Sequence, residues 1–345
     1  MKKKYLTFTF WEKIIRHYVN LMLRKVWAPI ISYRQARLAF TPANAIVIFG
    51  APRGGTTWML EIISHVKGTV PNFEPFHAVQ GVVPNDLDLH AVSEAYTPEA
   101  APQLIDFLTQ TLTGARFNFW TTMYTRPHHF RNPRYVVTKT IRGHHLLPFV
   151  VSNMSLSRPP VVIVRHPIPT CQSQLQSFGN NGRARRMTAD EIDQKRGLLQ
   201  RHKQILLAPS SDLAYKVMLW CIFHVPILKD EAVLQRTILV LYEDLLLNPA
   251  AETNRIIRQL NLNEDHFDAA TVNFRKASKT NFNASLEAAP LKQLEKGIKQ
   301  LSETELNEIQ QVLDYFSVKL YTASSPVPNK AFLPGSLHGG VIPGQ

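Results

Sequence analysis

The sequence has 345 residues, of which 45% are hydrophobic and 19% are charged. This length and composition suit one large α/β domain with additions, or two ordinary domains, and exclude a disordered chain, a collagen and a disulfide scaffold. Lysine and arginine number 39 against 26 acidic residues, so the formal net charge is +13. Such a balance favours an anionic partner, which includes nucleic acid, a membrane surface, a nucleotide and an acidic glycan.

The two cysteines, Cys171 and Cys221, lie far apart in the sequence and have no CxxC spacing. Neither a disulfide framework nor a zinc cluster is therefore expected, and a reducing compartment fits this cysteine usage. The histidines show no metal-ligand spacing either, so the sequence predicts no metal site.

Residues 1–40 are expected to form a basic N-terminal segment of their own. Apolar residues from Trp11 to Met22 follow helical spacing and are interrupted by lysine and arginine, which predicts an amphipathic helix rather than a signal peptide or a membrane span. Two interpretations stay open: a helix packed on the protein body, and one resting on an anionic membrane. We expect a cytoplasmic protein whose membrane contact, if any, is peripheral.

Short apolar runs alternate with helical patterns along most of the chain. The predicted strands cover residues 45–49, 135–138, 161–164 and 237–241. The predicted helices cover residues 56–66, 101–112, 144–151, 168–178, 190–207, 212–230, 249–260 and 302–320. This alternation predicts an α/β fold with a central parallel sheet flanked by helices, and a ligand at the carboxyl ends of its strands.

Polar composition marks the stretches between and after these elements. Residues 68–100 and 179–190 are predicted to be surface segments because they are rich in proline, asparagine, glycine and charge. We expect a single α/β domain over residues 41–320 and an irregular, Pro/Gly-rich tail over residues 321–345.

The most informative segment is residues 50–58, Gly-Ala-Pro-Arg-Gly-Gly-Thr-Thr-Trp, between a predicted buried strand and a predicted helix. In that context a glycine-rich loop lets backbone N–H groups approach a phosphate. The GxxxxG spacing is that of a nucleotide-triphosphate loop, but Thr56 stands where such loops have lysine. Arg53, inside the loop, is the fixed cation instead.

This segment resembles the 5′-phosphosulfate loop of sulfotransferases, which use 3′-phosphoadenosine-5′-phosphosulfate (PAPS) as the sulfuryl donor. The resemblance implies that Arg53 holds the phosphosulfate and stabilises charge on the departing phosphate oxygen. It also implies nucleotide contacts from the rest of the loop and the helix start: Gly54, Gly55, Thr56, Thr57 and Trp58. In this family serine is commoner at the position of Gly54.

Two further segments carry the same resemblance. The strand 161–164 runs into Arg165, and Ser173 follows eight residues later, as in the family's 3′-phosphate site. Both groups are therefore expected to bind that phosphate, and two helical turns would bring the hydroxyl back near the guanidinium. The Tyr-Glu-Asp-Leu run at 242–245 also matches, and for Glu243 and Asp244 we expect only capping and ion pairs.

A base for the acceptor proton is less clearly marked. Lys139-Thr140 resembles the strand that continues into a histidine base in cytosolic phenol and steroid sulfotransferases, but here Ile141 follows. Lys139 is expected either to reach the bridging oxygen or acceptor, or to be a solvated lysine. Glu74 lies in a Glu-Pro segment similar to that of carbohydrate and bacterial sulfotransferases, which implies a base role. His77 and the pair His144 and His145 are competitors.

The resemblance thus implies a PAPS-dependent sulfotransferase, nearer the carbohydrate and bacterial branch, that acts on a hydroxyl of a saccharide, glycolipid or other small molecule. Arg275, Lys276 and Ser278 are expected to complete its nucleotide site, while Arg142 and the cluster Arg183, Arg185 and Arg186 either steer anions or are merely solvated. The alternatives are a P-loop nucleotide kinase and a non-catalytic basic nucleotide- or polyanion-binding protein. Nucleic acid is not an expected partner, because no zinc-finger or RNP-like segment accompanies the charge, and the oligomeric state stays open.

Overall fold

The computed structural model describes residues 8–77, 79–84, 87, 101–178, 182–194, 198–262, 267, 272 and 290–333, with the backbone alone for residues 8–21 and 101. Its centre is one sheet of five parallel strands in the order β2-β3-β1-β4-β5. The strands are β1 (Ala45–Gly50), β2 (Thr69–Phe73), β3 (Tyr135–Thr140), β4 (Val161–Val164) and β5 (Ile238–Leu241).

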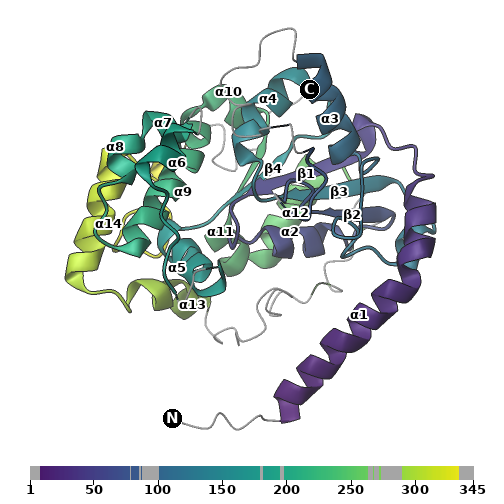
Figure 1. Cartoon of the computed structure of the whole chain (residues 1–345), viewed down its shortest axis with the longest axis horizontal. Coiled ribbons are helices and arrows are strands. Elements are labelled where there is room, and N and C mark those ends of the chain that lie inside the picture. The colour runs from purple at the N-terminus through teal and green to yellow at the C-terminus, as the bar shows by residue number, and fades with distance from the viewer. Residues whose placement is uncertain are drawn as a thin grey trace.

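Helices cover both faces of the sheet (Figure 1). One face carries α2 (Thr56–Ile63), α11 (Tyr242–Leu247), α12 (Pro249–Gln259) and α13 (Pro290–Ile298). The other carries α3 (Ala101–Leu112), α4 (Leu147–Asn153), α5 (Pro167–Phe178), α9 (Asp212–Lys229), α10 (Glu231–Gln235) and α14 (Glu303–Tyr315). The remaining α-helices are α1 (Phe8–Gln35), α6 (Ala189–Asp193), α7 (Leu198–Arg201) and α8 (Lys203–Leu206). Short 3-10 turns include η3 (Pro127–Phe130), η4 (His144–Leu146) and η7 (Lys330–Phe332).

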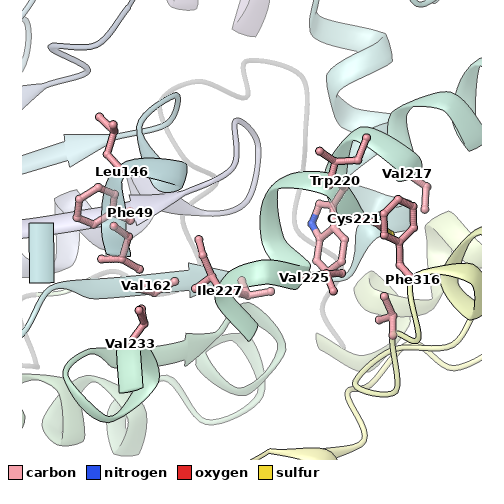
Figure 2. Close-up of a cluster of buried hydrophobic side chains, with 14 of the residues drawn as sticks. Phe49, Leu146, Val162, Val217, Trp220, Cys221, Val225, Ile227, Val233 and Phe316 are labelled. Atoms are coloured by element: carbon pink, nitrogen blue, oxygen red, sulfur yellow. The ribbon is translucent and has the colours of Figure 1, made fainter. Parts of the chain in front are cut away.

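The central strand β1 explains why its sequence is apolar without alternation. Ile46 and Ile48 point into the core under α2, whereas Val47 and Phe49 point into the core under α4 and α9. Every residue of β1 is buried, because helices cover the strand on both sides. Figure 2 shows the second of these cores running from Phe49 on the sheet to α9 and the segment after α14.

The predicted fold class is confirmed, and the four predicted strands are present. The prediction of a surface segment over residues 68–100 was wrong at its start, because β2 forms there with all five residues buried. The strand was not predicted because it contains Pro71. Proline cannot donate a backbone hydrogen bond to a neighbouring strand and normally argues against a strand. It is accepted here because β2 is an edge strand that pairs only with β3.

Some helix predictions also need correction. The single helix predicted over residues 190–207 is instead the three short helices α6, α7 and α8, and α13 was not predicted. The last helix begins after Ser302, whose hydroxyl accepts from the Glu305 N–H as a cap. It ends earlier than residue 320, because Ser317 adopts a left-handed backbone with φ of 53°.

The two ends of the described chain differ in how they meet the body. Helix α1 extends away from it at its N-terminal end (Figure 1), and no helix within the described residues is both long and apolar enough to cross a membrane. Residues 321–333 of the tail contain one short 3-10 turn and keep Tyr321 and Ala323 buried.

Candidate active site

The predicted site residues gather where strands β1, β2, β3 and β4 end. The loop 51–55 follows β1, Glu74 follows β2, Lys139 lies at the end of β3, and Arg165 follows β4. The strand order turns at β1, with β3 and β2 on one side and β4 and β5 on the other. This carboxyl edge is where open α/β sheets bind their ligands.

The loop 51–55 is held in a tight, partly left-handed conformation. Arg53 has a φ of 65° and Gly55 a φ of 98°, and the Gly54 N–H donates to the Ala51 carbonyl over 3.0 Å. A Cβ on Gly55 would lie 2.6 Å from the Tyr242 ring, so only glycine fits there. Arginine in the left-handed region is uncommon and strained, a feature that clusters at functional sites.

Arg53 contacts both Ser173 and Arg165, although it lies more than a hundred residues before either of them along the chain. The Arg53 Nε donates to the Ser173 hydroxyl over 2.8 Å. The Arg165 Nη1 donates to the Arg53 carbonyl oxygen over 3.1 Å. Helix α5 begins at Pro167 and carries Ser173 in its second turn. The sequence predicted that this hydroxyl lies near the Arg165 guanidinium, whereas within the described residues its hydrogen bond is with Arg53.

Two neighbouring guanidinium groups concentrate positive charge at this corner and make it a candidate anion site. Burial lowers the pKa of Arg53, and the positive charge of Arg165 lowers it further. The Arg165 Nε is buried and has no hydrogen-bond partner among the described residues. An anion between the two cations would offset their repulsion and satisfy that donor, so the corner fits a phosphate group.

The first turn of α2 adds backbone donors to the same corner. Gly55 occupies the N-cap position and supplies no side-chain cap, so it leaves the N–H groups at the helix start to other acceptors. Thr56 and Thr57 are buried there. Trp58, by contrast, packs into the core and meets the Tyr242 ring edge-on at 5.7 Å.

Tyr242 is a site residue that the sequence reasoning left unassigned. Its ring lies 4.4 Å from the Arg165 guanidinium and packs on Trp58. It also occupies the space next to Gly55 where any other residue would have its Cβ. Tyr242 therefore holds the loop 51–55 next to Arg165, with which its ring makes a cation–π contact. Its position at the start of the Tyr-Glu-Asp-Leu run, which resembles a segment of the sulfotransferases, was the signal available in the sequence.

Glu74 and Lys139 form a buried ion pair beside this corner. The Lys139 Nζ donates to Glu74 Oε1 over 2.5 Å and to the Thr57 hydroxyl over 2.8 Å. Lys139 is only 2% exposed, so its interpretation as a solvated strand-end lysine was wrong. Burial lowers the pKa of Lys139, and the charge of Glu74 opposes that shift.

The backbone around Glu74 is strained and tightly bonded. Glu74 has a φ of 43°, its N–H donates to the Lys139 carbonyl over 2.9 Å, and its own carbonyl accepts from the His77 N–H over 3.0 Å. Its side chain keeps 10% of its surface exposed, unlike that of its lysine partner. The carboxylate therefore pairs with a buried cation while part of its side chain stays exposed.

His77 lies three residues after Glu74, and its ring meets that of Trp120 edge-on at 5.0 Å. Its Nδ1 accepts from the Val79 and Gln80 N–H groups over 3.3 and 3.1 Å, so the proton of the neutral ring is on Nε2. Burial lowers the pKa of His77, and the charge of Arg142 lowers it further. A ring in this state donates a hydrogen bond from Nε2 and has no free nitrogen to take up a proton.

His144 and His145 are buried in η4 and pack against α9. The His144 ring lies 4.9 Å from that of His224 and 5.3 Å from that of Phe223. In the surface segment, Arg185 pairs with Glu191 and Arg186 pairs with Asp212. Arg275, Lys276 and Ser278 lie outside the described residues.

Glu243 has the capping role predicted for it. It is fully buried and accepts from the His166 backbone N–H over 2.8 Å and from the Tyr321 hydroxyl over 3.0 Å. Burial raises the pKa of Glu243 above its ordinary value. Asp244 pairs with Lys330 over 2.7 Å. These contacts tie the end of β5 to β4 and to the C-terminal segment.

The chain matches the model of the sulfotransferase family over residues 45–266, which is more than half of its length. It therefore belongs to the sulfotransferase family, a family of transferase enzymes. The matched region contains the loop 51–55, the Glu74–Lys139 pair and the corner where Arg53 contacts Ser173 and Arg165.

A solved structure, the sulfotransferase domain from the Synechococcus PCC 7002 olefin synthase, is similar to this chain at 15% identity and a TM-score of 0.42. The similarity covers 83% of this chain and 98% of that one. A comparison with curated protein sequences gave no match. Within the described residues, no group of three or more histidine, cysteine, aspartate or glutamate side chains is arranged to hold a metal ion.

Proposed function

We propose that the protein transfers the sulfuryl group of PAPS to a hydroxyl of an acceptor molecule. The observation that carries this proposal is the corner where Arg53 contacts Ser173 and Arg165. The Glu74–Lys139 pair lies beside it, because Lys139 also donates to Thr57 in the helix that follows the Arg53 loop. Two arginines fixed side by side suit a nucleotide that carries both a 5′-phosphosulfate and a 3′-phosphate. Arg53 and the start of α2 would hold the former, and Arg165 with Ser173 the latter.

The transfer requires no group beyond the donor, the acceptor and a base. The acceptor oxygen forms a bond to sulfur while the bond between sulfur and the 5′-phosphate oxygen breaks, and that oxygen keeps the bonding electron pair. Glu74 takes the proton of the acceptor hydroxyl. Arg53 stabilises the negative charge that develops on the departing phosphate oxygen, as fixed cations do in phosphoryl transfer.

Lys139 and His77 have supporting places in this scheme. Lys139 donates to Thr57 at the start of α2 and to Glu74, so it links the proposed nucleotide site to the proposed base. From this position it can donate to the bridging oxygen of the donor. His77 presents its Nε2–H, which suits a hydrogen bond to the acceptor better than removal of its proton. Glu74 is therefore our choice of base.

For the acceptor we propose a hydroxyl of a carbohydrate or a lipid. The support is the Glu-Pro segment at Glu74 and Pro75, which resembles the carbohydrate and bacterial branch, together with Ile141 in place of the histidine of the phenol and steroid branch. Arg142 lies close enough to His77 to lower its pKa electrostatically. It favours an acceptor that carries negative charge near this end of the site.

The test is incubation of the protein with radiolabelled PAPS and a panel of saccharide, lipid and phenolic hydroxyls. We expect label on a saccharide or lipid acceptor, without added magnesium, and release of the desulfated nucleotide in step with transfer. A nucleotide kinase would instead need magnesium and ATP. A non-catalytic binder would bind the nucleotide and transfer no label to any acceptor, which would contradict the proposal.

A further inference from the structure

Helix α1 presents two different faces from residue 22 onward. Its inner face touches the body at every turn: Arg24 donates to the Phe119 carbonyl over 2.7 Å, Ile31 is 4% exposed, and Gln35 donates to the Gly114 carbonyl over 2.8 Å. These contacts anchor the C-terminal half of the helix. The interpretation of α1 as packed on the body therefore holds for this inner face.

The opposite face is an exposed apolar stripe. We call Met22, Val26, Ile30 and Tyr33 the outer stripe; their exposures are 68%, 68%, 47% and 60%. With 3.6 residues per turn, spacings of four, four and three place them within an arc of about 80°. Large apolar side chains exposed singly are ordinary, but four along one helix face indicate an interaction surface.

The sequence continues this pattern toward the N-terminus. Stepping back from Met22 by the same spacings reaches Val19, Ile15 and Trp11, which are all apolar. The helix backbone extends through these positions to Phe8, away from the body (Figure 1). An apolar stripe along a projecting helix suits a flat surface better than a groove in a folded partner.

The charge of this segment identifies the kind of surface. Residues 1–37 hold nine lysines and arginines against one acid, Glu12, so they carry +8 of the chain's net +13. Lys25 and Arg34 flank the outer stripe, and the Arg37 guanidinium lies 3.5 Å from the Tyr33 ring. Pairing two copies through this face would bring together two such positive segments, whereas anionic lipid headgroups neutralise them.

We propose that the outer stripe of α1 binds the surface of an anionic lipid bilayer, with its apolar side chains in the headgroup and acyl boundary and its basic side chains on the phosphates. The helix lies in the interface without crossing it, as basic amphipathic helices do. This inference goes beyond sulfuryl transfer and does not depend on it.

The test is vesicle flotation of the full chain with two lipid compositions, phosphatidylcholine alone and an equal mixture with phosphatidylserine. The protein should float with the anionic vesicles only, and added salt should release it. Replacing Met22, Val26 and Ile30 together with serine should lower the partition coefficient about tenfold or more, since each buried apolar group contributes to binding.

The matched control is a triple serine variant at Leu207, Leu291 and Val327, which are exposed apolar residues elsewhere in the molecule, at 48%, 47% and 38%. It should float as the unchanged protein does, and both variants should show unchanged thermal unfolding. Three outcomes would overturn the proposal: no flotation of the unchanged protein, undiminished flotation of the outer-stripe variant, and a dimer in light scattering that this variant abolishes.

Discussion

Two glutamates follow parallel strands of the same sheet, yet their surroundings differ, and only Glu74 is proposed here as a base. Glu243, after β5, is sealed and accepts from a backbone N–H and a tyrosine hydroxyl. Glu74, after β2, sits in a strained backbone, pairs with Lys139 and stays partly exposed. Position at a strand end therefore does not by itself suggest a base. Partial exposure and a cationic partner are the features on which the proposal for Glu74 rests.

The largest effect that separates the two is expected from Glu74→Gln. Loss of the base should lower kcat for transfer about 10²- to 10⁴-fold, since general-base catalysis contributes that much. Affinity for the desulfated nucleotide should stay unchanged, because the phosphate corner is intact. Steady-state transfer assays and titration calorimetry measure the two quantities.

Glu74→Gln should also lower the stability of the folded protein. Lys139 stays buried and loses its charged partner, so unfolding free energy should fall, although the amide oxygen still accepts its hydrogen bond. Full transfer activity in this variant would assign the base role elsewhere, with His144 and His145 the remaining candidates.

The buried region around Glu243 and His166 should instead show a stability that depends on pH. Burial lowers the pKa of His166 from 6.5 to about 4, so the unfolded chain takes up that proton first as pH falls. The associated stability, about 3 kcal/mol, is present above pH 6.5 and is lost as pH falls toward 4. Urea unfolding across this window should show the loss.

The variant His166→Asn removes this titration, so its unfolding free energy should fall less over the same window. His224 has the same lowered pKa, of about 4, and should keep its own contribution in the variant. Glu243 works in the opposite direction, because its raised pKa favours the folded state as pH falls. Identical pH slopes for the variant and the unchanged protein would refute the His166 assignment.

Tyr242, the neighbour of Glu243, should have an intermediate effect. Tyr242→Leu removes the cation–π contact to Arg165, worth about 0.5–2 kcal/mol, and should weaken nucleotide binding about two- to thirtyfold. Tyr242→Phe keeps the ring and should bind normally. Equal weakening in both variants would attribute the effect to the hydroxyl rather than to the ring.

The smallest effect is expected from Glu243→Gln. The amide keeps an acceptor for the His166 N–H, and the Tyr321 hydroxyl can reorient to accept from the amide nitrogen. Unfolding free energy at neutral pH should change by about 1 kcal/mol or less, and transfer should continue. A loss of transfer as large as that of Glu74→Gln would erase the distinction between the two glutamates.

The sequence predicted those parts of the site that depend on short spacings. The loop at Arg53 and the eight-residue step from Arg165 to Ser173 are local patterns between a strand and a helix, and the predicted helix that carries Ser173 is present. The contact that the Ser173 hydroxyl makes is with Arg53 rather than with Arg165, and the local spacing did not predict it. The alternation of buried strands and helices predicted the fold class in the same way.

The remainder depended on partners from distant segments. Lys139 looks like a solvated strand-end lysine until Glu74 and Thr57 enclose it. Pro71 argues against β2 until the sheet order makes it an edge strand. Tyr242 gains its role only when β5 brings it beside Gly55 and Arg165. None of these contacts leaves a spacing pattern in one sequence.

The central claim is that Arg53 and Arg165 hold one nucleotide between them. Titration calorimetry with 3′-phosphoadenosine-5′-phosphate should show binding that falls about tenfold or more in each of Arg53→Ala and Arg165→Ala, since hydrogen bonds to charged groups contribute about 1.5–3 kcal/mol. Arg186→Ala, at a surface ion pair, is the control and should bind normally. Unchanged affinity in both alanine variants at the corner would contradict the account.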